Sequence, residues 1–420
     1  MNALTRKGSP GPAGIARIGV LGGGIAGLTM AVALRNAGLD CVVFEQAPRV
    51  ETAGLGLQIT PNASRLLARL GVGEAVDAVA TQPLSIDVHR WDDGHRLART
   101  PLGEACVETF GAPYYTVHRA DLQQLLLRVL PTDTVRLGRR CVAVRCASDS
   151  VTAVFADGAE ATFDVLVGAD GIGSVARRAL ADDVRRFSGQ VAYRGLVPAD
   201  ALPEWQGEPR VRGWFGPAQH CVCYPVSGGR FISLTAMTPD ATVSVSEDSP
   251  AAQWNAPAGP AEDGAAPAAS LARAAAEAYD GWDPLVRKLL QSAAALSLWR
   301  LNDRDPLPRW SRSRLTLIGD AAHPMLPFRA QGANQAIEDA VVLTDCLRQA
   351  DDVQTALCRY EELRLTRTTR IQLSSRESAE VFHLGDGDLQ LERDRDMPER
   401  WALRNNEWLF GYRAESAALA

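Results

Sequence analysis

The sequence is poor in lysine and has no long apolar run. Lys7 and Lys288 are the only lysines among 44 basic residues, so arginine carries almost all of the positive charge. The formal net charge is −6 and no basic block occurs, which argues against nucleic acid or an anionic membrane as a partner. No apolar stretch has the length that spans a bilayer. Residues 1–15 are polar, lack the apolar centre of a secretory signal, and are predicted to be a disordered leader.

The eight cysteines lack the paired CxxC spacing of zinc sites. The closest two in sequence, Cys221 and Cys223, alternate as residues on one face of a strand do. We therefore expect a reduced, cytoplasmic setting and no metal site.

The strongest pattern is a glycine-rich turn between two apolar strands. Residues 17–21 suit a buried strand, and Gly22-x-Gly24-x-x-Gly27 follows directly. Apolar residues at helical spacing run from Leu28 to Leu34, and a second strand over 41–44 leads to Glu45. Strand, glycines, helix, strand and acid within about thirty residues form the dinucleotide-binding fingerprint in its required context.

Each part of the fingerprint has a physical role toward a dinucleotide. Gly22 permits a tight turn, Gly24 leaves the backbone open to a pyrophosphate, and Gly27 lets helix and strand approach closely. The helix N-terminus offers free N–H groups and a partial positive charge to the phosphates. Glu45 can accept hydrogen bonds from ribose hydroxyls, and its charge disfavours a 2′-phosphate.

Two later apolar runs end in acidic turns. Residues 164–171 end in Gly-Ala-Asp-Gly and are typical of a strand buried on both faces of a parallel sheet. Residues 314–324 repeat the pattern and end in Gly-Asp-Ala-Ala-His-Pro. A helix expected over 335–350 then places residues 332–334 at its N-terminus, a site for electron-rich groups. We expect the acids at 338 and 339, in its early turns, to suit the helix dipole.

Length and composition favour two lobes. The chain of 420 residues exceeds one typical domain, and 46% hydrophobic with 22% charged residues describes a globular protein with a large core. The predicted fold class is α/β: a Rossmann-like domain with a parallel sheet, an inserted antiparallel-sheet lobe and C-terminal helices. The nucleotide domain is expected over 16–85, 115–183 and 300–350, the inserted lobe over 86–114 and 184–299, and the helical region over 351–420.

Individual elements are predicted within these lobes. Alternating stretches with Gly-rich turns predict strands over 190–196, 211–215, 220–226 and 230–236, with a hairpin that begins at 86–90. Helical spacing predicts helices over 271–278, 284–292 and 354–379. The Ala/Pro-rich stretch 251–269 has few large apolar residues and is expected to be a mobile loop.

Three separated motifs together resemble one enzyme family. The glycine fingerprint with Glu45, the run that ends at Gly171 and the run over 319–324 resemble the single-component, FAD-dependent aromatic hydroxylases, also called group A flavoprotein monooxygenases. The resemblance covers about residues 16–380. Within the family, residues 101–104, 115–122 and 408–412 are most similar to the branch of 6-hydroxynicotinate 3-monooxygenases and salicylate hydroxylases.

The resemblance implies hydroxylation of a small aromatic substrate, phenolic or heteroaromatic and with or without a carboxylate. It implies tightly but non-covalently bound FAD, NADH or NADPH as a transient co-substrate, O₂, and a flavin C4a-hydroperoxide. By this resemblance the cofactor-binding residues are Gly22, Gly24, Ala26, Gly27, Glu45, Gln46, Gly56, Arg119, Asp170, Asp320, Gly332, Ala333 and Asn334.

The substrate-side candidates also come from this resemblance. Tyr224 and His220 stand where the branch has a catalytic Tyr and a substrate-side His, so Tyr224 is the candidate base and His220 its assistant. A core aromatic and an exposed strand-end histidine are the alternatives. Gln58, Pro327 and Arg329 are the candidate substrate contacts. Gln58 replaces a histidine of the branch and cannot act as a base, and Arg329 stands where an uncharged residue is usual.

Two other classes of function stay open. One is an FAD-dependent epoxidase or related oxidoreductase that acts on a larger natural product. The other is a flavin-binding regulator without turnover, against which the intact Asp320 and Gly332 argue. The sequence has no Trp-x-Trp-x-Ile-Pro run, which argues against the related halogenases. Monomer and homodimer are both open.

Overall fold

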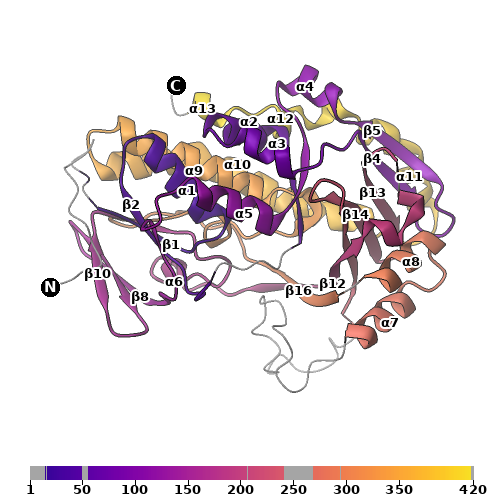
Figure 1. Cartoon of the computed structure of the whole chain (residues 1–420), viewed down its shortest axis with the longest axis horizontal. Helices are drawn as coiled ribbons and strands as arrows, with labels where there is room; N and C mark the ends of the chain where they lie inside the picture. Colours follow the sequence, from indigo (N-terminus) through magenta and orange to yellow (C-terminus); the bar gives the residue numbers. More distant parts are fainter. Residues whose placement is uncertain are drawn as a thin grey trace.

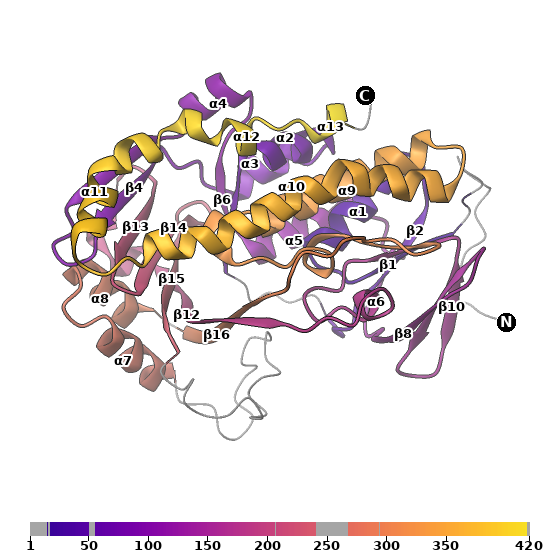
Figure 2. The same cartoon turned by 180° about the vertical axis from the view of Figure 1, so that it is seen from behind.

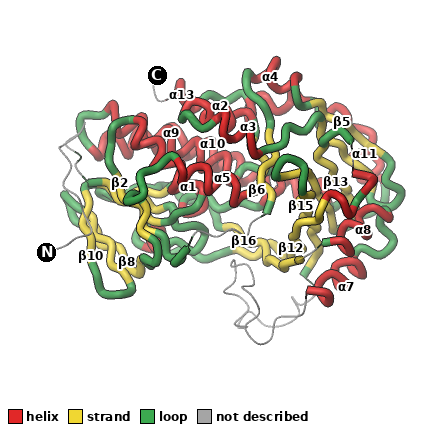
Figure 3. The backbone as a smooth tube through the Cα atoms, in the orientation of Figure 1, coloured by secondary structure: helices red, strands yellow, loops and turns green. Residues whose placement is uncertain are grey.

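The structure is a computed structural model that describes residues 15, 17–49, 55–205, 207–240, 268–293 and 295–417. The expected leader, apart from Ile15, and the expected loop over 251–269, apart from its last two residues, lie outside this part of the chain. Strands gather toward the two ends of the molecule and long helices run between them (Figure 1 and Figure 3).

A five-stranded sheet forms one end of the molecule. Its order is β17–β11–β1–β2–β7, and all neighbouring pairs are parallel. The strands are β1 (Ile18–Leu21), β2 (Cys41–Phe44), β7 (Val135–Arg136), β11 (Val165–Gly168) and β17 (Leu315–Leu317). Every residue of β1, β11 and β17 is buried, because other elements cover both faces of the sheet. The parallel sheet predicted from these apolar runs is confirmed.

Helices cover one face of this sheet. They are α1 (Ile25–Asn36), α5 (Arg119–Arg128) and α9 (Gly332–Gln349). Helix α10 (Val353–Phe382) packs against α9 and continues beyond the parallel sheet to the opposite end of the molecule, as Figure 2 shows. The other face is covered by a three-stranded antiparallel sheet of β8 (Cys141–Cys146), β9 (Val151–Phe155) and β10 (Glu160–Phe163), with α6 (Val175–Arg178).

Glu338 and Asp339 do not serve the dipole of α9, and that expectation was wrong. The helix begins at Gly332, so both acids lie past its first turn, where they are fully buried. Arg364 of α10 pairs with both of them, and Arg367 pairs with Glu338. Burial acts to raise the pKa of each carboxyl group, but the neighbouring positive charges outweigh it and the pKa values are lowered. These acids therefore fasten α9 to α10.

A seven-stranded sheet forms the other end. Its order is β16–β12–β15–β14–β13–β4–β5, antiparallel except for the parallel pair β13–β4. Its strands are β4 (Ser85–Arg90), β5 (Arg96–Pro101), β12 (Arg186–Pro198), β13 (Arg210–Gly216), β14 (Gln219–Val226), β15 (Phe231–Pro239) and β16 (Ala295–Asp303). Helices α7 (Ala268–Ala278) and α8 (Pro284–Ser292) pack on one face. The four predicted strands, the hairpin and both helices are confirmed, whereas β16 was not predicted.

The remaining elements lie between the two ends or pack against one of them. A two-stranded antiparallel ribbon pairs β3 with β6, and η5 and η6 are short 3₁₀ turns. They are β3 (Gly56–Ile59), β6 (Tyr115–His118), α2 (Pro61–Arg69), α3 (Gly73–Val79), α4 (Glu104–Phe110), η5 (Gly319–Ala321), η6 (Pro327–Arg329), α11 (Asp388–Arg400), α12 (Glu407–Phe410) and α13 (Ala414–Ala417). In the described part of the chain, no helix combines the length and hydropathy that crossing a bilayer requires.

Candidate active site

A continuous cavity of about 1690 Å³ runs from the parallel sheet to the seven-stranded sheet. Its walls are the glycine turn before α1, the strand β3, the free face of the seven-stranded sheet and the loop that joins η5 to α9. Pockets for single drug-sized ligands measure about 300–1,000 Å³. The cavity is therefore large enough for an extended cofactor together with a small second molecule.

The glycine turn has the geometry that a dinucleotide requires. Gly22 has φ +102°, and a Cβ on it would lie 2.3 Å from the carbonyl oxygen of Ala169. A Cβ on Gly27 would lie 1.9 Å from the carbonyl oxygen of Gly22. At Gly24 a Cβ would meet only Nη2 of Arg119, at 3.9 Å, among the described residues. The backbone at Gly24 and at the start of α1 is thus open to a phosphate.

Glu45 fixes this turn from the end of β2. Its Oε2 accepts the N–H of Gly23 at 2.7 Å, and its Oε1 accepts the N–H of Ala47 at 2.8 Å. Glu45 and the neighbouring Gln46 both line the cavity, as does Ala26 of α1. Each carboxylate oxygen has a further lone pair, so Glu45 can hold the turn and still accept a ribose hydroxyl.

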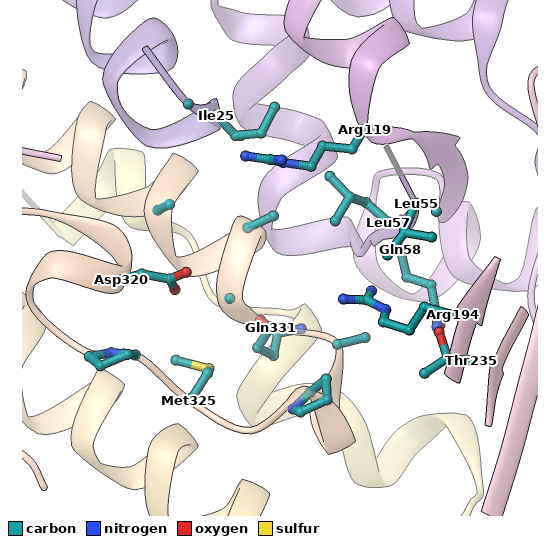
Figure 4. A pocket seen from close by; sticks show the side chains of 18 of the residues that line it. Ile25, Leu55, Leu57, Gln58, Arg119, Arg194, Thr235, Asp320, Met325 and Gln331 are labelled. Atoms are coloured by element: carbon teal, nitrogen blue, oxygen red, sulfur yellow. The ribbon is translucent and has the colours of Figure 1, made fainter. Parts of the chain in front are cut away.

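Two unpaired charges, Asp320 and Arg119, point into the cavity near the glycine turn (Figure 4). Within the described residues, neither the Asp320 carboxylate nor the Arg119 guanidinium makes a hydrogen bond or an ion pair. Burial raises the pKa of Asp320, and the charges of His323 and Arg119 act in the opposite direction. Gly332, at the start of α9, lies beside this carboxylate, since a Cβ there would be 3.7 Å from Oδ1 of Asp320, an ordinary contact distance. Both residues are exposed to the cavity, so a ligand with phosphates and hydroxyls can pair with them here.

The side chains of Asp170 and Asn334 form hydrogen bonds with other residues of the protein. The Asp170 carboxylate accepts hydrogen bonds from Ser174 Oγ and from two N–H groups at the start of α6, although the residue lines the cavity. The Asn334 amide donates to the carbonyl oxygens of Gln58 and Ala330 and accepts the N–H of Thr60. Asn334 thereby ties β3 to α9, and Ala333 beside it lines the cavity.

Tyr224 of β14 stands at the opposite end of the cavity. Gly56 faces its ring closely, since a Cβ on Gly56 would lie 2.4 Å from Tyr224 Cε2. Burial raises the pKa of Tyr224, while the charge of Arg194 and hydrogen bonds from Ser233 and Gln58 act to lower it. These three influences stabilise the tyrosinate form relative to an ordinary buried tyrosine. The side-chain Oε1 of Gln58 accepts a hydrogen bond from the hydroxyl of Tyr114, so the side-chain amide links two tyrosines.

His220, also on β14, is paired with a histidine that the sequence did not reveal. Its Nδ1 lies 2.7 Å from Nε2 of His383, which caps the C-terminus of α10. Burial lowers the pKa of His220 well below its usual value and lowers that of His383 to about 4. Both rings are therefore neutral near pH 7, and only Nε2 of His220 remains for a ligand.

The remaining candidates lie at the cavity wall. Pro327 and Arg329 are exposed on η6 and line the cavity. Although the residue is exposed to the cavity, loss of part of its hydration at the cavity wall lowers the pKa of Arg329, and the charge of Glu377 of α10 acts in the opposite direction. Sequence reasoning missed Arg194 of β12, which also lines the cavity. The available signal was a lone arginine inside the otherwise apolar strand pattern over 191–197.

Comparisons with known proteins agree with this geometry. The family model described as "FAD binding domain" matches residues 16–372. The 3-amino-4-hydroxybenzoate 2-monooxygenase PtmB3 of Streptomyces platensis is 46% identical over 399 residues, which cover 95% of this chain and 96% of that protein. The 6-hydroxynicotinate 3-monooxygenase of Pseudomonas fluorescens is 32% identical, over 94% of each. A salicylate hydroxylase substrate complex superposes with a TM-score of 0.76 at 29% identity, and covers 96% of this chain and 97% of that one.

Proposed function

The chain belongs to the FAD binding domain family, and on this premise we propose how its cavity works. It is an FAD-dependent aromatic monooxygenase that uses NAD(P)H and O₂. The observation that carries the proposal is the continuous cavity. One end of it is the glycine turn, whose open backbone can bind phosphates, and the other end is the polar site around Tyr224. An epoxidase on a larger natural product is not favoured, because the named relatives act on small hydroxyaryl and heteroaryl acids.

We propose that the cofactor lies along the glycine turn and extends past Asp320. The backbone at Gly24 and the N-terminus of α1 would receive the pyrophosphate, and Glu45 a ribose. Arg119 would face the phosphates, and Asp320 would accept the ribityl hydroxyls. FAD bound there would supply the chemistry that activates O₂, with NAD(P)H as the reductant. The protein residues position the ring, exclude water and hold the substrate.

We propose that Tyr224 receives the proton of the substrate hydroxyl. Loss of that proton makes an aromatic ring more electron-rich, and a positioned base contributes typically about 10²–10⁴-fold to a rate. Burial raises the pKa of Tyr224 overall, and the charge of Arg194 with hydrogen bonds from Ser233 and Gln58 opposes that rise in favour of the tyrosinate that this role requires. His220 would then contact the substrate only through Nε2, as a neutral group, because His383 holds Nδ1.

We propose a small hydroxyaryl acid as the substrate class, with 3-amino-4-hydroxybenzoate as the first compound to test because of the PtmB3 relative. The test is a panel of hydroxybenzoates, aminohydroxybenzoates and hydroxynicotinates, each added to the FAD-loaded protein with NADH or NADPH under isotopically labelled O₂. At least one compound should accelerate flavin reduction and gain one labelled oxygen atom. Production of hydrogen peroxide alone with every compound would overturn the proposal.

A second measurement tests the role of Tyr224. Tyr224→Phe keeps the ring but removes the oxygen, so FAD and substrate affinities should be retained while turnover falls by about 10²–10⁴-fold. The pH at which the wild-type rate half-rises should report the group that loses a proton, and this transition should disappear in Tyr224→Phe. An unchanged rate in the variant would assign Tyr224 to packing of the sheet.

A further inference from the structure

Arg194 stands in the middle of the sheet face that lines the Tyr224 end of the cavity. It pairs in register with Thr235 of β15 and Ser297 of β16, and all three residues line the cavity. Successive residues of a strand point to opposite faces, and Tyr193 next to Arg194 packs into the core under α7 and α8. The backbone register therefore holds Arg194 on the cavity face.

The Arg194 guanidinium has no counter-charge among the described residues. It makes no hydrogen bond or ion pair there, and its Nε is buried without a partner. Its Cζ lies 5.7 Å from the centroid of the Trp299 ring. Burial lowers the pKa of Arg194, and the other groups that influence this pKa are Tyr224 and Arg119, neither of them a carboxylate. Arg194 is half-buried, and an unpaired guanidinium with a buried Nε costs free energy that an anionic ligand would offset.

Arg194 is separate from the cofactor end of the cavity. Arg119 lies at the glycine turn, next to the open backbone of Gly24. Figure 4 shows Arg194 on another wall, beside Thr235 and below Gln58. Arg119 and Arg194 are therefore cations at two separate places of the cavity, neither with a partner among the described residues, and the phosphates of one dinucleotide account only for Arg119.

We propose that Arg194 binds the carboxylate of the aromatic substrate and makes the enzyme selective for hydroxyaryl acids over their uncharged analogues. This inference rests on the proposed function. The planar guanidinium presents paired N–H donors that match both oxygens of a carboxylate. The Thr235 hydroxyl, which also makes no hydrogen bond with the described residues, adds a donor beside it. Tyr224 lies on the same sheet face, so a ring anchored by its carboxylate at Arg194 can present its hydroxyl to Tyr224.

The alternative is that Arg194 serves only to lower the pKa of Tyr224. Its positive charge does act in that direction. The two roles differ in what the loss of the charge changes. A carboxylate-binding residue controls the difference in affinity between an acid and its amide, whereas a residue that acts through Tyr224 controls the pH dependence of the rate.

Binding to the FAD-loaded protein, measured without NAD(P)H, separates the two roles. The probes are 3-amino-4-hydroxybenzoate and its uncharged carboxamide. Calorimetry and the change in flavin absorbance measure the affinity of each probe. Arg194→Met should weaken binding of the acid by about 10- to 100-fold and that of the carboxamide by less than about threefold. Arg194→Lys, which keeps the charge but not the planar fork, should recover part of the loss.

Arg212→Met is the matched control. Arg212 belongs to the same sheet but stacks over the Trp205 ring at 4.3 Å and does not line the cavity. The Arg212→Met substitution should leave the affinities for the acid and for the carboxamide unchanged. Retention of FAD by Arg194→Met, read from its flavin absorbance, should show that the lost contact is not with the cofactor.

Three results would overturn the assignment: equal losses for acid and carboxamide, no loss for either, or release of FAD from Arg194→Met. A wild-type protein that binds the two probes equally would overturn it as well. If Arg194→Met changed the pH dependence of the rate but kept the preference for the acid over the carboxamide, the role of Arg194 would be to lower the pKa of Tyr224. The proposed function fails on a different result, namely that no aromatic compound gains an oxygen atom although the acid binds through Arg194.

Discussion

At the scale of single residues, Gly24 differs from its neighbours in the glycine turn. A Cβ at Gly27 would collide with the protein backbone, whereas among the described residues one at Gly24 would meet only Nη2 of Arg119, at 3.9 Å. We therefore expect Gly24→Val to fold with the melting temperature of the apoprotein but to be purified without FAD, because the side chain occupies the place of the pyrophosphate. Flavin absorbance and thermal unfolding measure both effects. A yellow Gly24→Val protein would contradict the placement of the pyrophosphate at Gly24. Gly24→Ala adds a smaller side chain at the same position for comparison.

The negative charge of Asp320 should destabilise the folded apoprotein and strengthen binding of the cofactor. The Asp320 side chain is exposed to the cavity, where loss of part of its hydration raises its pKa in the folded apoprotein, so the ionised form destabilises the fold at pH values above the pKa of the unfolded chain. Asp320→Asn should therefore make the apoprotein more stable at neutral pH. The gain should vanish at acid pH, where the carboxyl group is protonated in both states.

The same variant should bind FAD more weakly. The loss of charged hydrogen bonds to ribityl hydroxyls is expected to cost about 1.5–3 kcal/mol in Asp320→Asn and in Asp320→Ala. Denaturant unfolding of the apoprotein and titration with FAD give the two quantities. Unchanged FAD affinity would show that Asp320 does not contact the cofactor.

At the scale of elements, the contact between α9 and α10 rests on buried charges. Arg364 Nε donates to Asp339 Oδ1 at 2.8 Å, Arg364 also pairs with Glu338, and all three side chains are fully buried. Arg364→Met leaves these carboxylates short of positive charge and is expected to lower the free energy of unfolding by about 3–5 kcal/mol at neutral pH. Both carboxyl pKa values are lowered in the folded state. The stability that they contribute is therefore present above their unfolded pKa values and is lost as the pH falls through the folded ones.

The control for this prediction is Arg359→Met on the same helix. Arg359 pairs with Glu362 at 3.5 Å, but 42% and 68% of the two side chains are exposed. Such surface pairs contribute about 0–1 kcal/mol, so the control should unfold almost as the wild type does. Denaturant titrations of the three proteins at neutral and acid pH measure the difference. Equal destabilisation by both substitutions would contradict the role of the buried pairs.

The elements were predictable where local pattern decides them. The strand β2 and the helix α8 have the predicted bounds, because an apolar run and an Asp–Pro start are local signals. The roles of Glu338 and Asp339 were not predictable, since their partner Arg364 lies 25 and 26 residues away on another helix. The pairing of His220 with His383 was not predictable either, because the two residues are 163 positions apart in the sequence. Arg194 was visible as an anomaly, but only the sheet register shows which face it lies on.

At the scale of the whole molecule, charge should govern how an anionic substrate reaches the cavity. The chain has a formal net charge of −6, which repels an aryl carboxylate at a distance. Arg329 is exposed on η6 at the cavity wall, and Glu377 of α10 is the acid that influences it. An exposed cation at this place would attract the substrate, whereas Arg194 inside would hold it.

We therefore expect Arg329→Met and Arg194→Met to act on different rate constants. Arg329→Met should slow association of 3-amino-4-hydroxybenzoate at low ionic strength and weaken its binding by about 1 kcal/mol or less, because solvent screens an exposed charge. The effect should fade as salt is added, and Glu377→Gln should change association in the opposite sense. Arg194→Met should instead raise the dissociation rate at every salt concentration, because its contact is buried. Stopped-flow measurements of flavin absorbance across ionic strength give both constants. If Arg329→Met raised the dissociation rate of the acid, independent of salt and without effect on the carboxamide, the carboxylate would belong to Arg329 at the cavity wall and not to Arg194 on the sheet.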